Sequence, residues 1–280
     1  MTREPIHTLH LFPILNEKLV TFLEKLSPAE WQAQTIARKW VVKDVVSHLL
    51  DTSLRRIAIH RDKWMLLPNR AIESHDDLVS YLNELNADWV NATRRLSPRM
   101  LIDWLRSANE TVYGIFMQLD PYGTSVFPVN WAGENSSFNW FDIAREYTER
   151  WLHQQQIRDA VGNRELLSPE LYKPLLDVFM QAWPHTLRNT ATPDGTLLKT
   201  TVTGEGGGDW WLVFEEGEWR KPVPGAMSQK KPAATTIIDG DAAWKLFSRS
   251  WRKEDAAGSV RIEGEERLGE IVLDMISVMA

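Results

Sequence analysis

The hydrophobic pattern of this 280-residue chain changes near residue 190, and this change constrains the fold more than any other feature. Before residue 190, apolar residues recur every three or four positions, the spacing of a helix with one buried face. After it come short runs of β-branched and aromatic residues separated by glycine-rich turns, the pattern of strands. The sequence therefore predicts an α+β protein with a helical N-terminal part and a small α+β C-terminal part.

The helices that the spacing predicts cover residues 9–26, 40–64, 74–96, 97–119, 140–160 and 169–188. Ser74 followed by Asp77, and Ser97 followed by Pro98, are typical helix starts. Pro174 and Pro184 interrupt the pattern of the sixth helix. The connection over 120–139 contains two prolines and two glycines, and unstructured connections of that length are uncommon and often functional.

The C-terminal pattern predicts a mostly antiparallel sheet. Its strands are expected at 196–203, 210–214, 218–220, within 231–238 and at 258–263, with helices at 241–251 and 265–279. We expect three parts in the chain: a helical bundle over 1–165, a bridging helix over 166–190 and the α+β domain over 191–280.

The composition excludes several classes of site and partner. The chain has no cysteine, which excludes disulfides, thiolate metal sites and a cysteine nucleophile. A net charge of -6 argues against nucleic-acid binding, which needs a clustered basic face. The sequence shows no signal peptide and no membrane-spanning run, so we expect a cytoplasmic protein with no membrane partner.

Three residues on the predicted helices have the spacing of a metal site. Glu149 and His153 are four residues apart, so their side chains share one helix face. His48 lies on another helix, from which it could complete a His2Glu set that leaves a coordination position for water or substrate. The alternative is a solvated i,i+4 pair with an unrelated histidine at a helix edge, and spacing alone leaves both interpretations open.

The segments around these residues resemble the mycothiol-dependent maleylpyruvate isomerase family. Residues 26–31 (LSPAEW) and 40–49 (WVVKDVVSHL) are similar to the start of that family's bundle, and 145–157 carries its Glu-x-x-x-His helix. Residues 235–241 (TTIIDGD) and 258–264 (GSVRIEG) are similar to its C-terminal domain. The resemblance implies a DinB-like up-and-down helical bundle followed by a sterol-carrier-like α+β domain.

The resemblance also implies a site and a cosubstrate. His48, Glu149 and His153 would be the ligands of a divalent metal, Zn²⁺ with Ni²⁺ as the alternative, and an external low-molecular-weight thiol such as mycothiol would be the cosubstrate. The chain departs from the family at Gln156, where many members have Asp, and a neutral amide cannot supply charge. The family's C-terminal arginine has three candidates, Arg249, Arg252 and Arg261.

These features lead to an expected function with two rivals. We expect a metal- and thiol-dependent isomerase or S-transferase that acts on a small electrophilic substrate, in which Arg145, one turn before Glu149, holds an anionic substrate. The first rival is a non-catalytic protein that binds a small molecule or lipid, and the second is a DinB-type hydrolase that uses metal-bound water. The chain would be a monomer or a homodimer.

Overall fold

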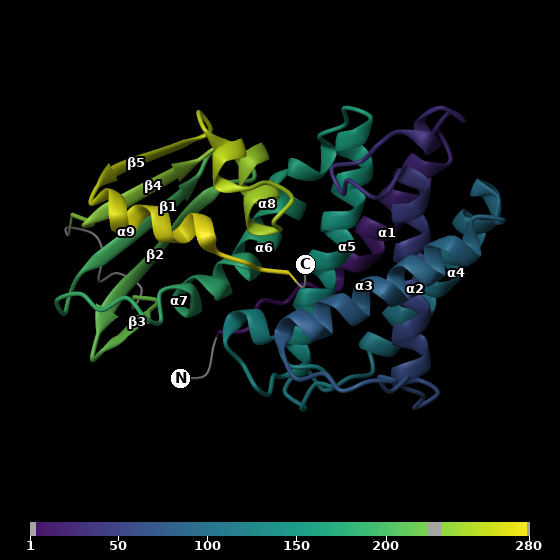
Figure 1. Cartoon of the computed structure of the whole chain (residues 1–280), viewed down its shortest axis with the longest axis horizontal. Coiled ribbons are helices and arrows are strands. Elements are labelled where there is room, and N and C mark those ends of the chain that lie inside the picture. Colours follow the sequence, from purple (N-terminus) through teal and green to yellow (C-terminus); the bar gives the residue numbers. More distant parts are fainter. Residues whose placement is uncertain (1–3, 223–230, 279–280) are drawn as a thin grey trace. The chain divides into compact units, whose positions relative to one another are not determined.

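The helices predicted in the first 160 residues are present in the computed structural model, which describes residues 4–222 and 231–278. They are α1 (Phe12–Leu23), α2 (Val42–His60), α3 (His75–Thr93), α4 (Pro98–Phe116) and α5 (Asn139–Ala160) (Figure 1). The Ser74 and Ser97 hydroxyls accept hydrogen bonds from backbone N–H groups in the first turns of α3 and α4, which confirms both predicted starts.

Helix α2 is shorter at both ends than the predicted range 40–64. It begins at Val42 because the preceding residue, Val41, is extended and donates its N–H to Asp44 Oδ2 at 3.1 Å. It ends at His60, shortly before Lys63, which has a φ of 56°. A left-handed residue cannot continue a right-handed helix, so the chain turns away at this point.

Contacts divide the chain into two units. The bundle unit comprises His7–Gly123 and Glu149–Arg164, and the sheet unit comprises Met1–Ile6, Thr124–Thr148 and Glu165–Ala280. Helix α5 therefore contributes its first part to the sheet unit and its last part to the bundle unit. In the bundle unit, α2 packs against α3 and α4, and α1 packs against α4.

The sheet unit contains a five-stranded sheet with the order β3-β2-β1-β4-β5. Its strands are β1 (Leu197–Val202), β2 (Gly208–Glu215), β3 (Glu218–Arg220), β4 (Ala234–Ile238) and β5 (Val260–Gly264). Every neighbouring pair is antiparallel except β1 and β4, which are parallel. The mostly antiparallel sheet is thus confirmed, and its two central strands form the exception.

Helices of the sheet unit pack on this sheet through specific polar contacts. In α6 (Pro169–Phe179), Asp177 Oδ1 accepts a hydrogen bond from Trp210 Nε1 of β2 at 2.8 Å. In α9 (Glu266–Glu270), the Gly269 carbonyl accepts one from Thr236 Oγ1 of β4 at 2.7 Å. Figure 1 shows α9 in yellow beside the sheet, and its contacts are with β4 and β5.

The bridging helix predicted over 169–188 is divided into shorter pieces. Helix α6 ends at Phe179, a 3-10 turn covers Met180–Ala182, and α7 (Trp183–Thr186) follows. Pro184 lies in the first turn of α7, where its missing N–H has no cost, although it would break a continuous helix. Pro174 is accommodated inside α6.

The last two predicted helices end earlier than their patterns suggest. Helix α8 (Gly240–Phe247) stops before 251 because Arg249 adopts a φ of 57°. After α9, a 3-10 turn covers Ile271–Asp274, and the prediction of a helix to residue 279, which itself lies outside the described residues, is wrong. Ser277 donates its N–H to Phe247 O and its hydroxyl to Phe179 O, both at 3.0 Å, so tertiary contacts draw this segment out of the helix.

These elements confirm the α+β fold class, with helices first and the sheet last in the chain. The domain boundaries at 165 and 190 stay a prediction. Within the described residues, no helix is long and apolar enough to cross a membrane.

Two glycines with the same backbone conformation provide a test of the sheet's packing. Gly258 and Gly264 have φ of 92° and 91°, but a Cβ at Gly258 meets nothing within 4 Å, whereas one at Gly264 would lie 2.2 Å from Ala233 O. We expect Gly258→Ala to lower the free energy of unfolding by about 1 kcal/mol through backbone strain alone. Gly264→Ala should cost about 1–3 kcal/mol more, because the backbone must move. Urea denaturation of both variants measures the difference, and equal losses would contradict this packing.

Candidate metal centre

His48 is placed by the apolar face of α2. Val45 and Leu49, on either side of it in the helix, are both fully buried, and this face carries the histidine into the bundle unit. Only 4% of His48 is exposed. The nitrogens of a buried imidazole need hydrogen-bond partners or a bound ligand, because burying unpaired polar atoms costs free energy.

Glu149 and His153 lie one helical turn apart on α5. His153 Nε2 and Glu149 Oε1 are 3.1 Å apart, and the histidine is buried while the carboxylate is half-buried. The i,i+4 spacing thus produces a close pair, as helix geometry requires. Because Glu149 keeps partial access to solvent, the pair lies at the border of the buried interior.

The structure brings together the three residues that the sequence nominates. His48, Glu149 and His153 each offer one ligand atom, and these atoms all lie within 4.8 Å of one another. The two imidazoles meet edge to face, with ring centroids 4.6 Å apart and an interplanar angle of 75°. In the described part of the chain, no other group of three or more histidine or acidic residues has this geometry.

Burial keeps His48 in its neutral form. The pKa of His48 is well below its usual range, mainly because burial disfavours the charged imidazolium and also because a charge on His153 would repel it. The negative charge of Glu149 partly opposes this effect. A neutral imidazole is the form that binds a metal ion, so His48 is ready to act as a ligand near neutral pH without losing a proton.

Gln156 orients the second imidazole. Its Oε1 lies 2.9 Å from His153 Nδ1, and an amide oxygen only accepts, so Nδ1 carries the hydrogen. This leaves a lone pair at Nε2, the nitrogen that faces Glu149. A hydrogen bond from the non-ligating nitrogen is the usual support of a metal-binding histidine. The neutral amide of Gln156 can therefore make this orienting contact without supplying charge.

The donor set fits a divalent cation on two observations. With Nδ1 protonated, His153 Nε2 and Glu149 Oε1 are two acceptors 3.1 Å apart, an arrangement that needs a second proton or a cation. Among the described residues, His48 has no hydrogen-bond partner at either nitrogen, and its Nδ1 is fully buried. Two imidazoles and one carboxylate form an N/O set that suits Zn²⁺ and Ni²⁺.

Trp40 is a component of the centre that spacing alone does not reveal. Its indole lies 4.8 Å from the His48 ring and 6.3 Å from the His153 ring, measured between centroids. The residue lies in the loop before α2, directly after a turn, so helical periodicity does not predict which side chains it meets. The signal available in the sequence is its place at the start of the motif that ends in His48.

Arg145, the arginine proposed to hold a substrate, has local partners. Arg145 is paired with Asp142 one turn earlier in α5, and its Nη1 donates to the Pro128 carbonyl at 3.4 Å. Its role in holding an anionic substrate stays a prediction. Of the three C-terminal candidates, Arg261 is exposed and lies 2.8 Å from Glu263, and Arg249 has the left-handed backbone that ends α8.

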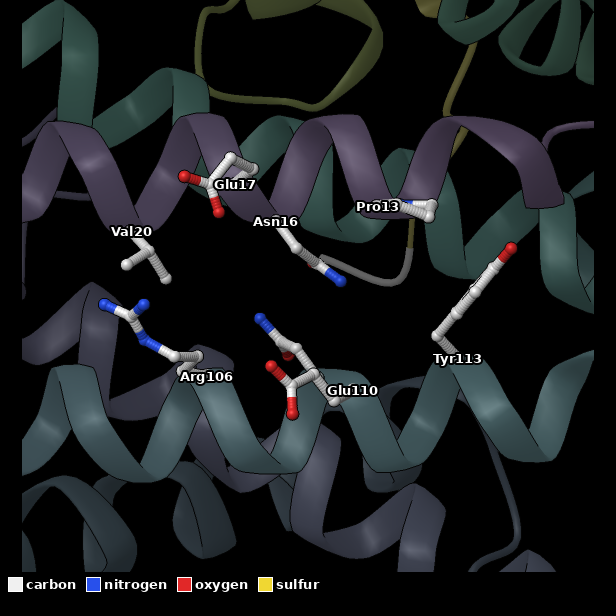
Figure 2. Close-up of a pocket in the computed structure, with 8 residues that line it drawn as sticks. Pro13, Asn16, Glu17, Val20, Arg106, Glu110 and Tyr113 are labelled. Atoms are coloured by element: carbon white, nitrogen blue, oxygen red, sulfur yellow. The ribbon is translucent and has the colours of Figure 1, made fainter.

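A separate cavity lies in the bundle unit between α1 and α4. Its volume is about 210 Å³, and Figure 2 shows Asn16 and Glu17 of α1 opposite Arg106 and Glu110 of α4. None of the three clustered residues lines it. Its two glutamates, Glu17 and Glu110, lie apart from the three clustered residues and therefore serve as controls for the centre.

Comparisons with known proteins agree with this architecture. The chain matches two crystal structures of the mycothiol-dependent maleylpyruvate isomerase over 92% of each chain. One is a histidine-to-alanine mutant, with 9% identity and a TM-score of 0.54, and the other has 10% identity and a TM-score of 0.53. At such identities the likeness concerns the fold alone. No curated protein sequence matches the chain.

A family model provides the stronger result. The model of the mycothiol maleylpyruvate isomerase N-terminal domain matches residues 13–158, which include His48, Glu149 and His153. This match covers more than half of the 280 residues. The chain therefore belongs to the mycothiol maleylpyruvate isomerase N-terminal domain family.

Proposed function

We propose that this protein is a metal-dependent isomerase or S-transferase that uses a low-molecular-weight thiol and acts on a small electrophilic substrate. The observation that carries the proposal is the cluster of His48, Glu149 and His153, whose ligand atoms lie within 4.8 Å of one another. Both imidazoles are buried, and that of His48 has no hydrogen-bond partner among the described residues. Family membership supports the thiol, because the matched structures are mycothiol-dependent enzymes.

The three side chains would hold the ion, Zn²⁺ with Ni²⁺ as the alternative. When bound, a divalent ion lowers the pKa of a coordinated thiol, so that a thiolate is present near neutral pH. Glu149 supplies the single negative charge of the ligand set, and neutral His48 and His153 add none. The set leaves the ion a net positive charge, which favours an anionic sulfur ligand.

The chain itself contributes no sulfur nucleophile, since it has no cysteine. The thiol must therefore come from a cosubstrate. Addition of its thiolate to an activated cis-alkene forms a C–S bond and turns the double bond into a rotatable single bond. Rotation followed by elimination of the same thiolate restores the alkene with trans geometry. If the C–S bond is instead kept and the carbanion protonated, the reaction is S-transfer.

Arg145 and Gln156 have different proposed roles. Gln156 acts through His153, whose ring it orients by the 2.9 Å hydrogen bond to Nδ1. Arg145 is the proposed contact for a substrate carboxylate, for which a guanidinium offers a bidentate geometry. Its present partner is Asp142, so substrate binding would compete with that ion pair.

Metal analysis is the first test of the proposal. Purified protein loaded with Zn²⁺ or Ni²⁺ and passed through a desalting column should retain about one ion per chain, because three protein ligands hold it. His48→Ala and His153→Ala should each reduce retention to a small fraction of this, as measured by plasma mass spectrometry. Glu110→Gln, in the cavity of Figure 2, is the matched control and should retain the ion fully. Wild-type protein that retains no ion contradicts the proposed centre.

The thiol requirement is tested by omission. Metal-loaded protein should convert a cis-alkene dicarboxylate such as maleylpyruvate only when a low-molecular-weight thiol is added, because no side chain can replace it. Mycothiol, glutathione and cysteine are compared in an absorbance assay that follows the alkene. Hydrolysis of an ester or amide panel at the same rate with and without thiol would instead identify a hydrolase that uses metal-bound water.

The role of Gln156 is tested by two substitutions of similar size. Gln156→Leu removes the acceptor at His153 Nδ1, and we expect metal affinity to fall about 10–100-fold. Gln156→Glu keeps an acceptor and adds charge, so affinity should equal or exceed that of the wild type. Competition with a chromogenic chelator gives both dissociation constants. Equal affinities for the leucine variant and the wild type would show that the hydrogen bond does not support the metal.

A further inference from the structure

The two imidazoles of the centre are held in different ways. His153 has polar partners at both nitrogens, Gln156 at Nδ1 and Glu149 at Nε2. Among the residues described, His48 has none at either nitrogen, although it is buried. A metal ion would engage only one nitrogen of His48, so no hydrogen bond would remain to define the rotation of its ring.

Packing against the indole of Trp40 can fix the rotation of the His48 ring, which no hydrogen bond among the described residues does. The indole lies 4.8 Å from the His48 ring at an interplanar angle of 40° and also contacts the His153 ring at 6.3 Å and 43°. With the imidazoles themselves 4.6 Å apart, the three rings form one cluster. Trp40 is half-buried, whereas both imidazoles are buried.

Trp40 is itself fixed by the chain around it. Its carbonyl accepts hydrogen bonds from Thr35 Oγ1 at 2.7 Å, Gln34 Nε2 at 2.9 Å and Thr35 N at 3.2 Å, and its N–H donates to Ala37 O at 2.7 Å. Gln34 also forms an isolated antiparallel bridge with Val41, the N-cap of α2. The segment 34–41 is therefore a closed loop tied to the start of the helix that carries His48.

We propose that Trp40 is a positioning residue for the metal centre. Its indole holds the His48 imidazole in the rotamer that faces Glu149 and His153, the task that the Gln156 hydrogen bond performs for His153. It also covers one side of the imidazole pair, which limits the direction from which a thiol can approach. The inference rests on the proposed metal-dependent function, but it concerns a residue that supplies no ligand atom.

Cobalt binding provides the first test of the positioning role of Trp40. Co²⁺ is a spectroscopic substitute for Zn²⁺, and its visible d–d bands report the arrangement of the ligands. Trp40→Leu should raise the dissociation constant for Co²⁺ about tenfold and change the shape of the bands, because His48 is no longer held in place. Trp40→Phe keeps an aromatic ring and should restore most of the affinity. Thr35→Val keeps the indole but removes the 2.7 Å hydrogen bond from Thr35 Oγ1 to the Trp40 carbonyl. Its dissociation constant for Co²⁺ should lie between those of the wild type and Trp40→Leu.

A matched control separates positioning from a general loss of tryptophan. Trp104 lies on α4, is 48% exposed and is not part of the ring cluster. Trp104→Leu should leave both the cobalt affinity and the spectrum unchanged. Far-UV circular dichroism and thermal melting establish that each variant is folded, and the phenylalanine and valine variants keep the test informative if Trp40→Leu does not fold.

A second readout uses the metal-free protein. The Cε1–H resonance of His48 should lie upfield because of the indole ring current, and in Trp40→Leu it should move downfield and broaden as the ring becomes free to rotate. If wild-type protein binds Co²⁺ and Trp40→Leu gives the same dissociation constant and bands, the positioning role is overturned while the metal centre stands. If wild-type protein binds no Co²⁺, the proposed function fails, and an unchanged His48 resonance in Trp40→Leu would overturn the positioning role as well.

Discussion

The burial of His48 beside the Glu149–His153 pair is the constraint on which the rest of the centre depends. Apolar packing of α2 carries into the bundle unit an imidazole that has no hydrogen-bond partner among the described residues. On α5, His153 Nε2 and Glu149 Oε1 lie 3.1 Å apart, a contact that needs a proton or a cation between the two atoms. A single divalent cation, as proposed for this cluster, would pair with both groups.

Each imidazole of the centre has a neighbouring side chain that contacts its ring, Gln156 for His153 and Trp40 for His48. Gln156 determines which nitrogen of His153 carries the hydrogen, and Trp40 packs on the ring of His48. One support is a hydrogen bond and the other is aromatic contact. The difference follows from position, because Gln156 shares a helix face with His153, whereas Trp40 reaches His48 from a closed loop before α2. A substitution of either support should act on the metal without removing a ligand.

The elements that deviate from their sequence patterns do so where tertiary contacts compete with local preference. The segment after α9 has apolar spacing that suits a helix, yet Ser277 bonds to the carbonyls of Phe247 and Phe179, and the chain leaves the helix to reach them. The parallel pair in the sheet is likewise decided by tertiary contacts. Strands β1 and β4 can be parallel because no short hairpin joins them, and no local pattern encodes which strands become neighbours. Periodicity identifies an element, but partners in space decide its end and its neighbours.

The sequence by itself determined the order of helices and strands and the absence of thiolate ligands, because periodicity and side-chain chemistry are local properties. Helical spacing made His48, Glu149 and His153 candidates for a metal site, and the family resemblance favoured them as ligands. The i,i+4 pair on α5 is likewise a consequence of helix geometry. Only the tertiary structure decided that His48 meets this pair, since residues about one hundred positions apart are joined by packing and not by spacing. It also decided that Trp40 packs against the imidazoles and that Gln156 is hydrogen-bonded to one of them, because a side chain's partners depend on its direction in the folded chain.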